Sequence, residues 1–336
     1  MLARSSVLTH KSGFKFETPL LVPSFSSKGF LFKKKGKSMI SEAKAMMEIA
    51  APALSDPILV SAFDMHHNHI LSAKRIAKIG SLTFIDSGGY EVAQYHDFSA
   101  VFKFPPYDTQ WTEPDLITVL DKWPRRYPAV IISFDLRGKS FMKQINAARQ
   151  LFGRYPDQMR DFLVKPERKN DSYVNVDALL HLVREFNQFD IIGITEKELG
   201  DSMLNRMLNI AKLRDALNKI RSTIPIHIFG SLDPLSSCLY FLAGAEIFDG
   251  LTWLRYSYSE GKTLYRHNHG VVEYGIFEED EVVKARSNRD NVYYMKRLQY
   301  DMRNFLDSRD FEHFGPNAEE LKKAYKTFKA NYGGAQ

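Results

Sequence analysis

The chain has 336 residues, of which 44% are hydrophobic and 26% are charged. This balance is typical of a soluble globular protein and excludes a disordered, collagen-like or disulfide-scaffold chain, because the apolar content suffices for a large core. The 46 basic and 40 acidic side chains leave a net charge of +6, which is compatible with a phosphate-rich partner without requiring one. Cys238 is the single cysteine, so an internal disulfide and a zinc site built from several thiolates are excluded.

The sequence contains no obvious membrane or export segment. No stretch reaches the roughly 18 uninterrupted apolar residues that a membrane-spanning helix needs. Residues 1–17 turn polar too early to supply the apolar region of a secretory signal. We therefore expect a cytoplasmic protein without a membrane partner, and the lone cysteine fits a reducing compartment.

Short apolar, β-rich runs alternate along the chain with longer segments of helical periodicity. The runs predict strands at residues 18–25, 57–63, 82–86, 129–135, 161–165, 189–195, 224–230 and 245–251. Helices are expected at residues 38–52, 70–79, 114–122, 139–152, 174–186, 200–220 and 233–243. Nearly continuous apolar strands that alternate with helices indicate a parallel sheet covered by helices.

Eight strands are the number found in the (β/α)8 TIM barrel, which we predict as the fold. A doubly wound open sheet could also hold eight strands, but the G-x-G-x-x-G fingerprint of a dinucleotide site is missing after the first run. We expect the barrel to take residues 1–260 and a helical C-terminal extension to take residues 261–336. Loop and one or two short strands are expected at 256–285, before helices at 286–307 and 317–331.

Three motifs resemble ligand sites without completing them. KKKGKS (33–38) lacks the first glycine of a phosphate loop, whose position is taken by Leu31, so we expect a flexible basic loop able to contact a backbone phosphate. The histidine groups at 66–69 and 267–269 lack convergent partner ligands, and no metal is predicted. The last helix carries four lysines spaced so that several share a face, which favours a solvated surface, with a nucleic-acid contact as the alternative: Lys322, Lys323, Lys326 and Lys329.

Carboxylates close three of the predicted strands. Asp86 ends the third run, Asp135 the fourth and Asp249 the eighth. Because the C-terminal ends of barrel strands meet at one rim, where active sites lie, these acids are expected to share a pocket. The alternative is that each aspartate caps the following helix. Glycine-containing turns after two of them favour the pocket, and the glycine pair of DSGGY (86–90) would let the backbone approach a ligand closely beside an aromatic ring.

Seven segments between residues 13 and 261 follow the order and spacing of one family's motifs. They are TPLLVPSFSSKG, FIDSGGYEV, ISFDLRG, FLVKPE, IIGITEKELG, IHIFGSLDP and AGAEIFDGLTWLR. In this the chain resembles the tRNA-guanine transglycosylases, (β/α)8 enzymes that exchange guanine for a 7-deazaguanine base in nucleic acid. The 20-residue spacing from Phe229 to Asp249 and the six-residue spacing from Asp249 to Arg255 match without gaps.

The resemblance implies a role for each matching residue. Asp249 would be the nucleophile that attacks the ribose C1′, and Asp86 would be the acid and base that serves the leaving and incoming bases. Asp135 would accept hydrogen bonds from the guanine-type edge, and Arg255 would hold ribose or phosphate. The remaining base-binding residues would be Ser87, Gly89, Tyr90, Lys165, Gly193, Phe229 and Gly230.

Base exchange on a ribose needs three acids in different states. One carboxylate traps the oxocarbenium-like state covalently, which splits one difficult displacement into two easier ones. A second carboxylic acid protonates the departing purine and deprotonates its replacement. A third stays ionised to accept hydrogen bonds from the base. Two acids in one pocket repel each other, which raises one pKa as general-acid chemistry requires. Tyr90 and Phe229 would sandwich the base, and no cofactor is expected.

The chain departs from the family's pattern at several positions. No cysteine follows Cys238, so the family's zinc module, C-x-C-x-x-C with a distal histidine that shapes the tRNA-holding domain, is absent. Lys165 replaces a glutamine, and Pro166 and Glu167 replace paired glycines near the group at the 7-position of the base. Glu91 replaces the glutamine after the aromatic residue.

The missing zinc module and the modest positive charge favour DNA over tRNA as the substrate. The expectation is a zinc-less transglycosylase that inserts a 7-deazaguanine base such as preQ0 into DNA. The target base must leave the stack, and a helper protein would assist that opening. A tRNA-guanine transglycosylase with the same chemistry is the alternative. Two alternatives come from other classes: a non-catalytic nucleic-acid-binding subunit of the same fold, and an unrelated barrel hydrolase.

Overall fold

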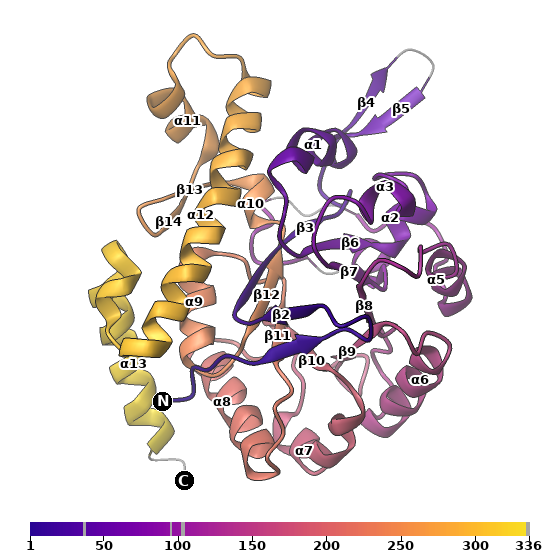
Figure 1. Cartoon of the computed structure of the whole chain (residues 1–336), viewed down its shortest axis with the longest axis vertical. Helices are drawn as coiled ribbons and strands as arrows, with labels where there is room; N and C mark the ends of the chain where they lie inside the picture. Colours follow the sequence, from indigo (N-terminus) through magenta and orange to yellow (C-terminus); the bar gives the residue numbers. More distant parts are fainter. Residues whose placement is uncertain (36–37, 95, 102–104, 334–336) are drawn as a thin grey trace.

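The computed structural model describes residues 1–35, 38–94, 96–101 and 105–333, and Figure 1 shows the arrangement of its elements. Parallel strands form a closed barrel in which the last strand pairs with the first. The strands are β3 (Leu20–Phe25), β6 (Ile58–Ser61), β7 (Thr83–Asp86), β8 (Ala129–Ile132), β9 (Met159–Val164), β10 (Ile191–Thr195), β11 (Ile226–Phe229) and β12 (Ile247–Gly250). The predicted (β/α)8 TIM barrel is confirmed, and each of the eight predicted runs overlaps one barrel strand.

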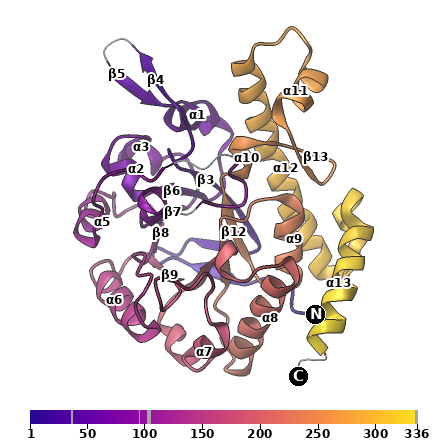
Figure 2. The same cartoon turned by 180° about the vertical axis from the view of Figure 1, so that it is seen from behind.

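Helices surround the barrel (Figures 1 and 2). They are α1 (Glu42–Ala50), α2 (Ala62–His66), α3 (Ala73–Ile76), α5 (Glu113–Leu120), α6 (Phe141–Gly153), α7 (Val176–Leu180), α8 (Met203–Lys219) and α9 (Pro234–Leu242). Helix α6 shows why such segments fold as they do, because Phe141, Ile145, Ala148 and Phe152 recur at helical spacing and are all buried. Two short helices, α4 (Gly89–Val92) and α10 (Thr252–Arg255), directly follow the acidic ends of β7 and β12. Short 3₁₀ segments lie at 51–53, 183–188, 196–198 and 311–317.

A hairpin that the sequence did not reveal covers one end of the barrel. Strands β1 (Val7–Thr9) and β2 (Lys15–Glu17) pair antiparallel and lie across the barrel in Figure 1. Leu8 of this hairpin belongs to the apolar cluster inside the barrel, together with Leu20 and Ile247 at the starts of their strands. The hairpin therefore closes the end at which the strands begin and leaves the end at which they finish for the acidic residues.

The C-terminal part packs onto the side of the barrel. It comprises β13 (Ser257–Ser259), β14 (Lys262–Leu264), α11 (Arg266–Tyr274), α12 (Asp280–Ser308) and α13 (Ala318–Gly333). The short strands and the last two helices agree with the prediction, but α11 was predicted as loop or strand and α12 begins six residues early. The Leu21 backbone N–H donates to Gln299 Oε1 of α12 at 3.1 Å, and Arg303 donates to the Glu17 carbonyl at 2.6 Å. The apolar core is thus continuous from the barrel to Phe305 and Phe328.

The lysine-rich motifs lie on the hairpin that follows β3 and on helix α13. The prediction of a loop at 33–38 was wrong for its described residues, which belong to an antiparallel hairpin of β4 (Phe32–Lys35) and β5 (Ser38–Ser41); residues 36–37 lie outside the described ranges. This hairpin and α11 project from the same end of the molecule (Figures 1 and 2). The four lysines of α13 are exposed, as expected for a solvated face. None of the helices in the described parts of the chain combines the length and hydropathy needed to cross a bilayer.

Candidate active site

A cavity opens where the barrel strands end, and each of the eight strands contributes to its wall directly or through the residues that follow it. This is the usual place of active sites in this fold. Nine of the predicted site residues line it: Asp86, Ser87, Gly89, Tyr90, Asp135, Lys165, Phe229, Gly230 and Asp249. Gly193 and Arg255, also predicted, lie behind the wall. The topology therefore brings the three strand-end acids to one cavity, as the sequence predicted.

Asp249, at the end of β12, is held by donors on both carboxylate oxygens. Ser24 Oγ donates to Oδ2 at 2.7 Å, and the Gly230 backbone N–H donates to Oδ1 at 3.2 Å. The Nε2 atom of His227 lies 3.2 Å from the same Oδ1. The residue is only 5% exposed and lines the cavity. Asp249 is therefore a fixed carboxylate rather than a helix cap.

His227 and Asp161 form the layer beneath Asp249, and the sequence interpretation missed both. His227 Nδ1 lies 2.7 Å from Asp161 Oδ2, and both residues are fully buried. Burial alone would lower the pKa of the His227 imidazole, but the carboxylates of Asp161 and Asp249 outweigh it and raise that pKa to about 9. The available signal was a titratable residue inside an apolar strand, two positions before Phe229 and so on the same inward face.

Asp86, at the end of β7, has a pKa close to neutral pH. Burial raises its pKa to about 6, and the negative charges of Asp249 and Asp135 add to that effect against the hydrogen bond from Gly88. The Gly88 N–H donates to Oδ2 at 3.2 Å from a left-handed backbone with φ of +86°. A Cβ at Gly88 would lie 2.8 Å from the Trp111 indole nitrogen, so only glycine fits this turn. The turn hydrogen bond uses one oxygen of Asp86, and the residue still lines the cavity.

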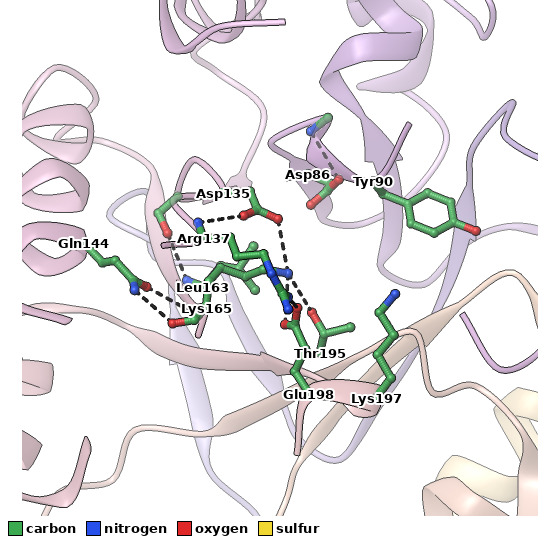
Figure 3. Close-up of polar contacts among 12 residues, drawn as sticks. Asp86, Tyr90, Asp135, Arg137, Gln144, Leu163, Lys165, Thr195, Lys197 and Glu198 are labelled. Carbon is green, nitrogen blue, oxygen red and sulfur yellow. Dashed lines mark hydrogen bonds and ion pairs between the residues drawn. The ribbon is translucent and has the colours of Figure 1, made fainter. Parts of the chain in front are cut away.

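Asp135, three residues beyond β8, belongs to a closed network of charges with Lys165 (Figure 3). Lys165 Nζ lies 3.1 Å from Asp135 Oδ2 and 2.9 Å from Glu198 Oε2. Glu198 Oε1 accepts a hydrogen bond from Arg137 Nη1 at 2.6 Å, and the Arg137 backbone N–H donates to Asp135 Oδ1 at 3.1 Å. Two cations thus balance two carboxylates. The carboxylate predicted to read the base is ion-paired, which the sequence did not indicate.

Lys165 is fixed at its backbone as well as at its ammonium. Gln144 of α6 accepts from the Lys165 N–H and donates to the Lys165 carbonyl, both at 2.9 Å, as Figure 3 shows. The ammonium also lies 3.4 Å from Thr195 Oγ1 at the end of β10. The Lys165 side chain is 1% exposed, yet the residue lines the cavity. A buried lysine in this position is a rigid donor rather than a mobile surface charge.

Tyr90, Asp97 and Arg255 form a third part of the site. The Tyr90 hydroxyl donates to Asp97 Oδ2 at 3.0 Å, and Arg255 Nη1 donates to Asp97 Oδ1 at 2.6 Å. Tyr90 and Asp97 line the cavity, whereas Arg255 lies one contact further out and also binds Ser99 Oγ. The predicted phosphate contact of Arg255 therefore requires a ligand that extends beyond the cavity wall.

Gly193 is required by the packing of Phe229 rather than by a ligand. A Cβ on Gly193 would lie 2.2 Å from the Phe229 ring, so a side chain there would displace the ring. The Phe229 ring in turn packs against the His227 ring at an interplanar angle of 31°, with ring centroids 3.9 Å apart. Because the Phe229 ring covers it, Gly193 does not line the cavity, in contrast to its predicted contact with the base.

Two further ionisable groups line the cavity without having been predicted to act there. Burial lowers the pKa of Lys197 to about 7, and its ammonium donates to the His96 carbonyl at 2.8 Å. Burial raises the pKa of Glu91 to about 8, with Asp64 and Asp86 adding to the shift, so Glu91 is largely protonated at neutral pH. Glu91 therefore presents a neutral acid where the resembling family has a neutral amide.

The histidine groups have aromatic neighbours. His66, His67 and His69 pack against one another and against Phe63 and Trp111. Within the described ranges, no group of three or more His, Cys, Asp or Glu side chains is arranged to hold a metal ion. The pair at 267 and 269, considered in the sequence as alternating strand positions, lies on helix α11.

The fold and the site define a (β/α)8 barrel with an acidic cavity at the end where the strands finish. No protein-family model and no curated protein matches the sequence.

Proposed function

We propose that this protein is a nucleic-acid guanine transglycosylase that exchanges guanine for a 7-deazaguanine base, such as preQ0, in DNA through a covalent aspartyl-ribose intermediate. The observation that carries the proposal is the convergence of Asp249, Asp86 and Asp135 from separate strands on one cavity. The three carboxyl groups have different environments. Asp249 is hydrogen-bonded by three donors, Asp86 has a raised pKa, and Asp135 is paired with a lysine. Base exchange needs three such states.

Asp249 and Asp86 have separate roles in the exchange of the base. A lone pair of the Asp249 carboxylate forms a bond to C1′ while the bond from C1′ to N9 of guanine breaks, and the electron pair leaves with the purine, which takes a proton from Asp86. The ionised Asp86 then removes the N9 proton of the incoming base, whose lone pair forms the new bond to C1′. The ester bond breaks and its electrons return to Asp249. A pKa of about 6 lets Asp86 serve in both directions near neutral pH.

Asp135 and Lys165 suit the edge that guanine and 7-deazaguanine bases share. That edge presents a carbonyl acceptor beside N–H donors on N1 and the 2-amino group. The ammonium of Lys165 and the carboxylate of Asp135, 3.1 Å apart, place a donor beside an acceptor, which complements the acceptor and donors of that edge. Adenine carries the opposite pattern at these positions and would leave both groups without a suitable partner. The pair thus supports a guanine-type base.

DNA is the favoured polymer for the reason given by the sequence. The family that the chain resembles carries, beyond its nucleophile, a zinc module that helps to hold tRNA, and no cysteine follows Cys238 here. The modest positive charge of the chain is compatible with contact to a phosphate backbone. A base within duplex DNA has to leave the stack to reach a cavity inside the barrel end.

The experiment is the exchange of radiolabelled guanine, and of preQ0, into single-stranded DNA, duplex DNA and tRNA by the full-length protein. Label entering DNA supports the proposal, and Asp249→Asn should remove it, whereas Asp177→Asn on the exposed face of α7 should not. Label entering only tRNA overturns the choice of polymer. If label enters neither polymer although both are bound, the protein is a non-catalytic subunit.

A further inference from the structure

A buried chain of three side chains runs from β9 through β11 to β12 beneath the cavity. Asp161 Oδ2 and His227 Nδ1 are 2.7 Å apart, and His227 Nε2 and Asp249 Oδ1 are 3.2 Å apart. Strand β11 pairs with β12, where His227 lies opposite Ile247, and with β10, where it lies opposite Gly193; β10 separates β11 from β9, which carries Asp161. Gly193 leaves room for the Phe229 ring, which covers the imidazole at 3.9 Å between centroids.

An imidazole placed between two carboxylates can donate to both only when both of its nitrogens carry a proton. The neutral ring would donate to one carboxylate and turn a lone pair toward the other, which is repulsive in a buried site. The titratable groups in contact with the ring are Asp161 from β9 and Asp249 from β12, both acidic, and its other contacts are the rings of Phe84 and Phe229. The surroundings therefore favour the imidazolium.

The two oxygens of Asp249 are unequal. Oδ1 accepts hydrogen bonds from His227 Nε2 and the Gly230 N–H, whereas Oδ2 accepts one hydrogen bond, from the Ser24 hydroxyl. The oxygen with fewer hydrogen-bond donors is the less stabilised of the two, so Oδ2 is the oxygen expected to form the bond to C1′. Oδ1 then becomes the carbonyl oxygen of the ester. A donor on this oxygen stabilises the ester least and the departing carboxylate most, which makes Asp249 a better leaving group.

We infer that His227, held by Asp161, is a positioning residue that acts through Asp249 and governs the second half of the exchange, in which the ribose is released from the enzyme. This inference rests on the proposed function. The hydrogen bond from His227 stabilises the free carboxylate most, the transition state less and the ester least. Its loss therefore slows resolution of the covalent intermediate and speeds its formation.

The test uses His227→Gln and His227→Phe in the full chain. Each variant is mixed with guanine-containing polymer to measure adduct formation on denaturing gels, and is then chased with labelled preQ0 to measure resolution. We expect the ratio of resolution rate to formation rate to fall on the order of 10- to 100-fold, more for Phe than for Gln, because glutamine keeps an amide donor. The adduct should accumulate at saturating preQ0, where wild type shows little.

Asp161→Asn supplies a second measurement if the histidine variants fold poorly. It retains an acceptor for His227 while removing the charge that keeps the ring protonated, so the ratio should fall in the same direction by a smaller factor. His181→Gln, at an exposed histidine, is the matched control and should leave the ratio unchanged. Because a ratio is independent of the folded fraction, a purely structural role would not move it.

The outcomes separate the two proposals. An unchanged ratio in the His227 and Asp161 variants, or a parallel loss of both rates, overturns the role of His227 while the transglycosylase assignment stands. Absence of both adduct and exchange in the wild-type protein, with DNA and with tRNA, is instead a failure of the proposed function.

Discussion

The two sides of the cavity hold similar numbers of charged groups but balance them differently. On the Asp249 side, Asp161 and Asp249 share one imidazolium, which leaves one negative charge in excess. On the Lys165 side, Asp135 and Glu198 face Lys165 and Arg137, so the charges cancel. A group whose charge is fully compensated gives fixed geometry, whereas an excess carboxylate can donate electrons to a substrate. Under the proposed function, the Lys165 side would serve recognition and the Asp249 side reaction.

Burial has opposite consequences on the two sides. Lys165 and Glu198 are each 1% exposed, and removing either would leave a charge without its counter-ion in a place that water does not reach. Asp249 has only uncharged donors besides His227, and these can follow a change in its charge without large rearrangement. We therefore expect variants on the Asp249 side to change rates and variants on the Lys165 side to change stability as well.

The largest expected effect is on activity at Asp249. Asp249→Asn keeps the size of the side chain but removes the nucleophilic charge, and we expect base exchange to fall by at least about 10⁴-fold with no covalent adduct. Exchange kinetics and denaturing gels measure both. The unfolding free energy should stay close to the wild-type value. Exchange at more than a hundredth of the wild-type rate would show that another residue is the nucleophile.

On the other side, Lys165→Met should have its main effect on folding. It leaves Asp135 and Glu198 without the cation between them, and removing one partner of a buried ion pair costs about 3–5 kcal/mol. Lys212→Met is the matched control, since Lys212 and Asp177 pair on the surface with side chains 38% and 74% exposed, and it should cost less than about 1 kcal/mol. Urea unfolding measures both values. Equal losses in the two variants would mean that the Lys165 network is solvated.

The sequence predicted the barrel because parallel strands buried on both faces are continuous apolar runs. Such runs can be recognised without knowing which strands pair with each other. It missed α11, whose sequence RHNHGVVEY has exposed valines and no regular apolar face. The three acids were predictable because topology alone brings strand ends together. The pairs Asp135–Lys165 and His227–Asp249 were not, because each depends on the register between neighbouring strands and on side-chain reach, which a pattern along one strand does not contain.

Asp86 lies between the two sides and gives the smallest effect on stability, whose magnitude depends on pH. Its carboxyl has a pKa of about 6 in the folded protein, against about 4 in an unfolded chain. A raised pKa means that the folded state binds the proton more tightly, so the protonated group favours folding below pH 4 and that contribution is lost as the pH rises to 6. Asp86→Asn should therefore raise the unfolding free energy by about 2 kcal/mol at pH 8 and by almost nothing at pH 4, while base exchange falls at both. Asp135→Asn should instead lower stability at pH 8, because it removes one of the counter-charges of Lys165. Urea unfolding of the two variants at both pH values compares them directly. If both variants changed the unfolding free energy in the same direction at pH 8, Asp86 would not differ from Asp135 as a buried acid without a counter-charge differs from one paired with a lysine.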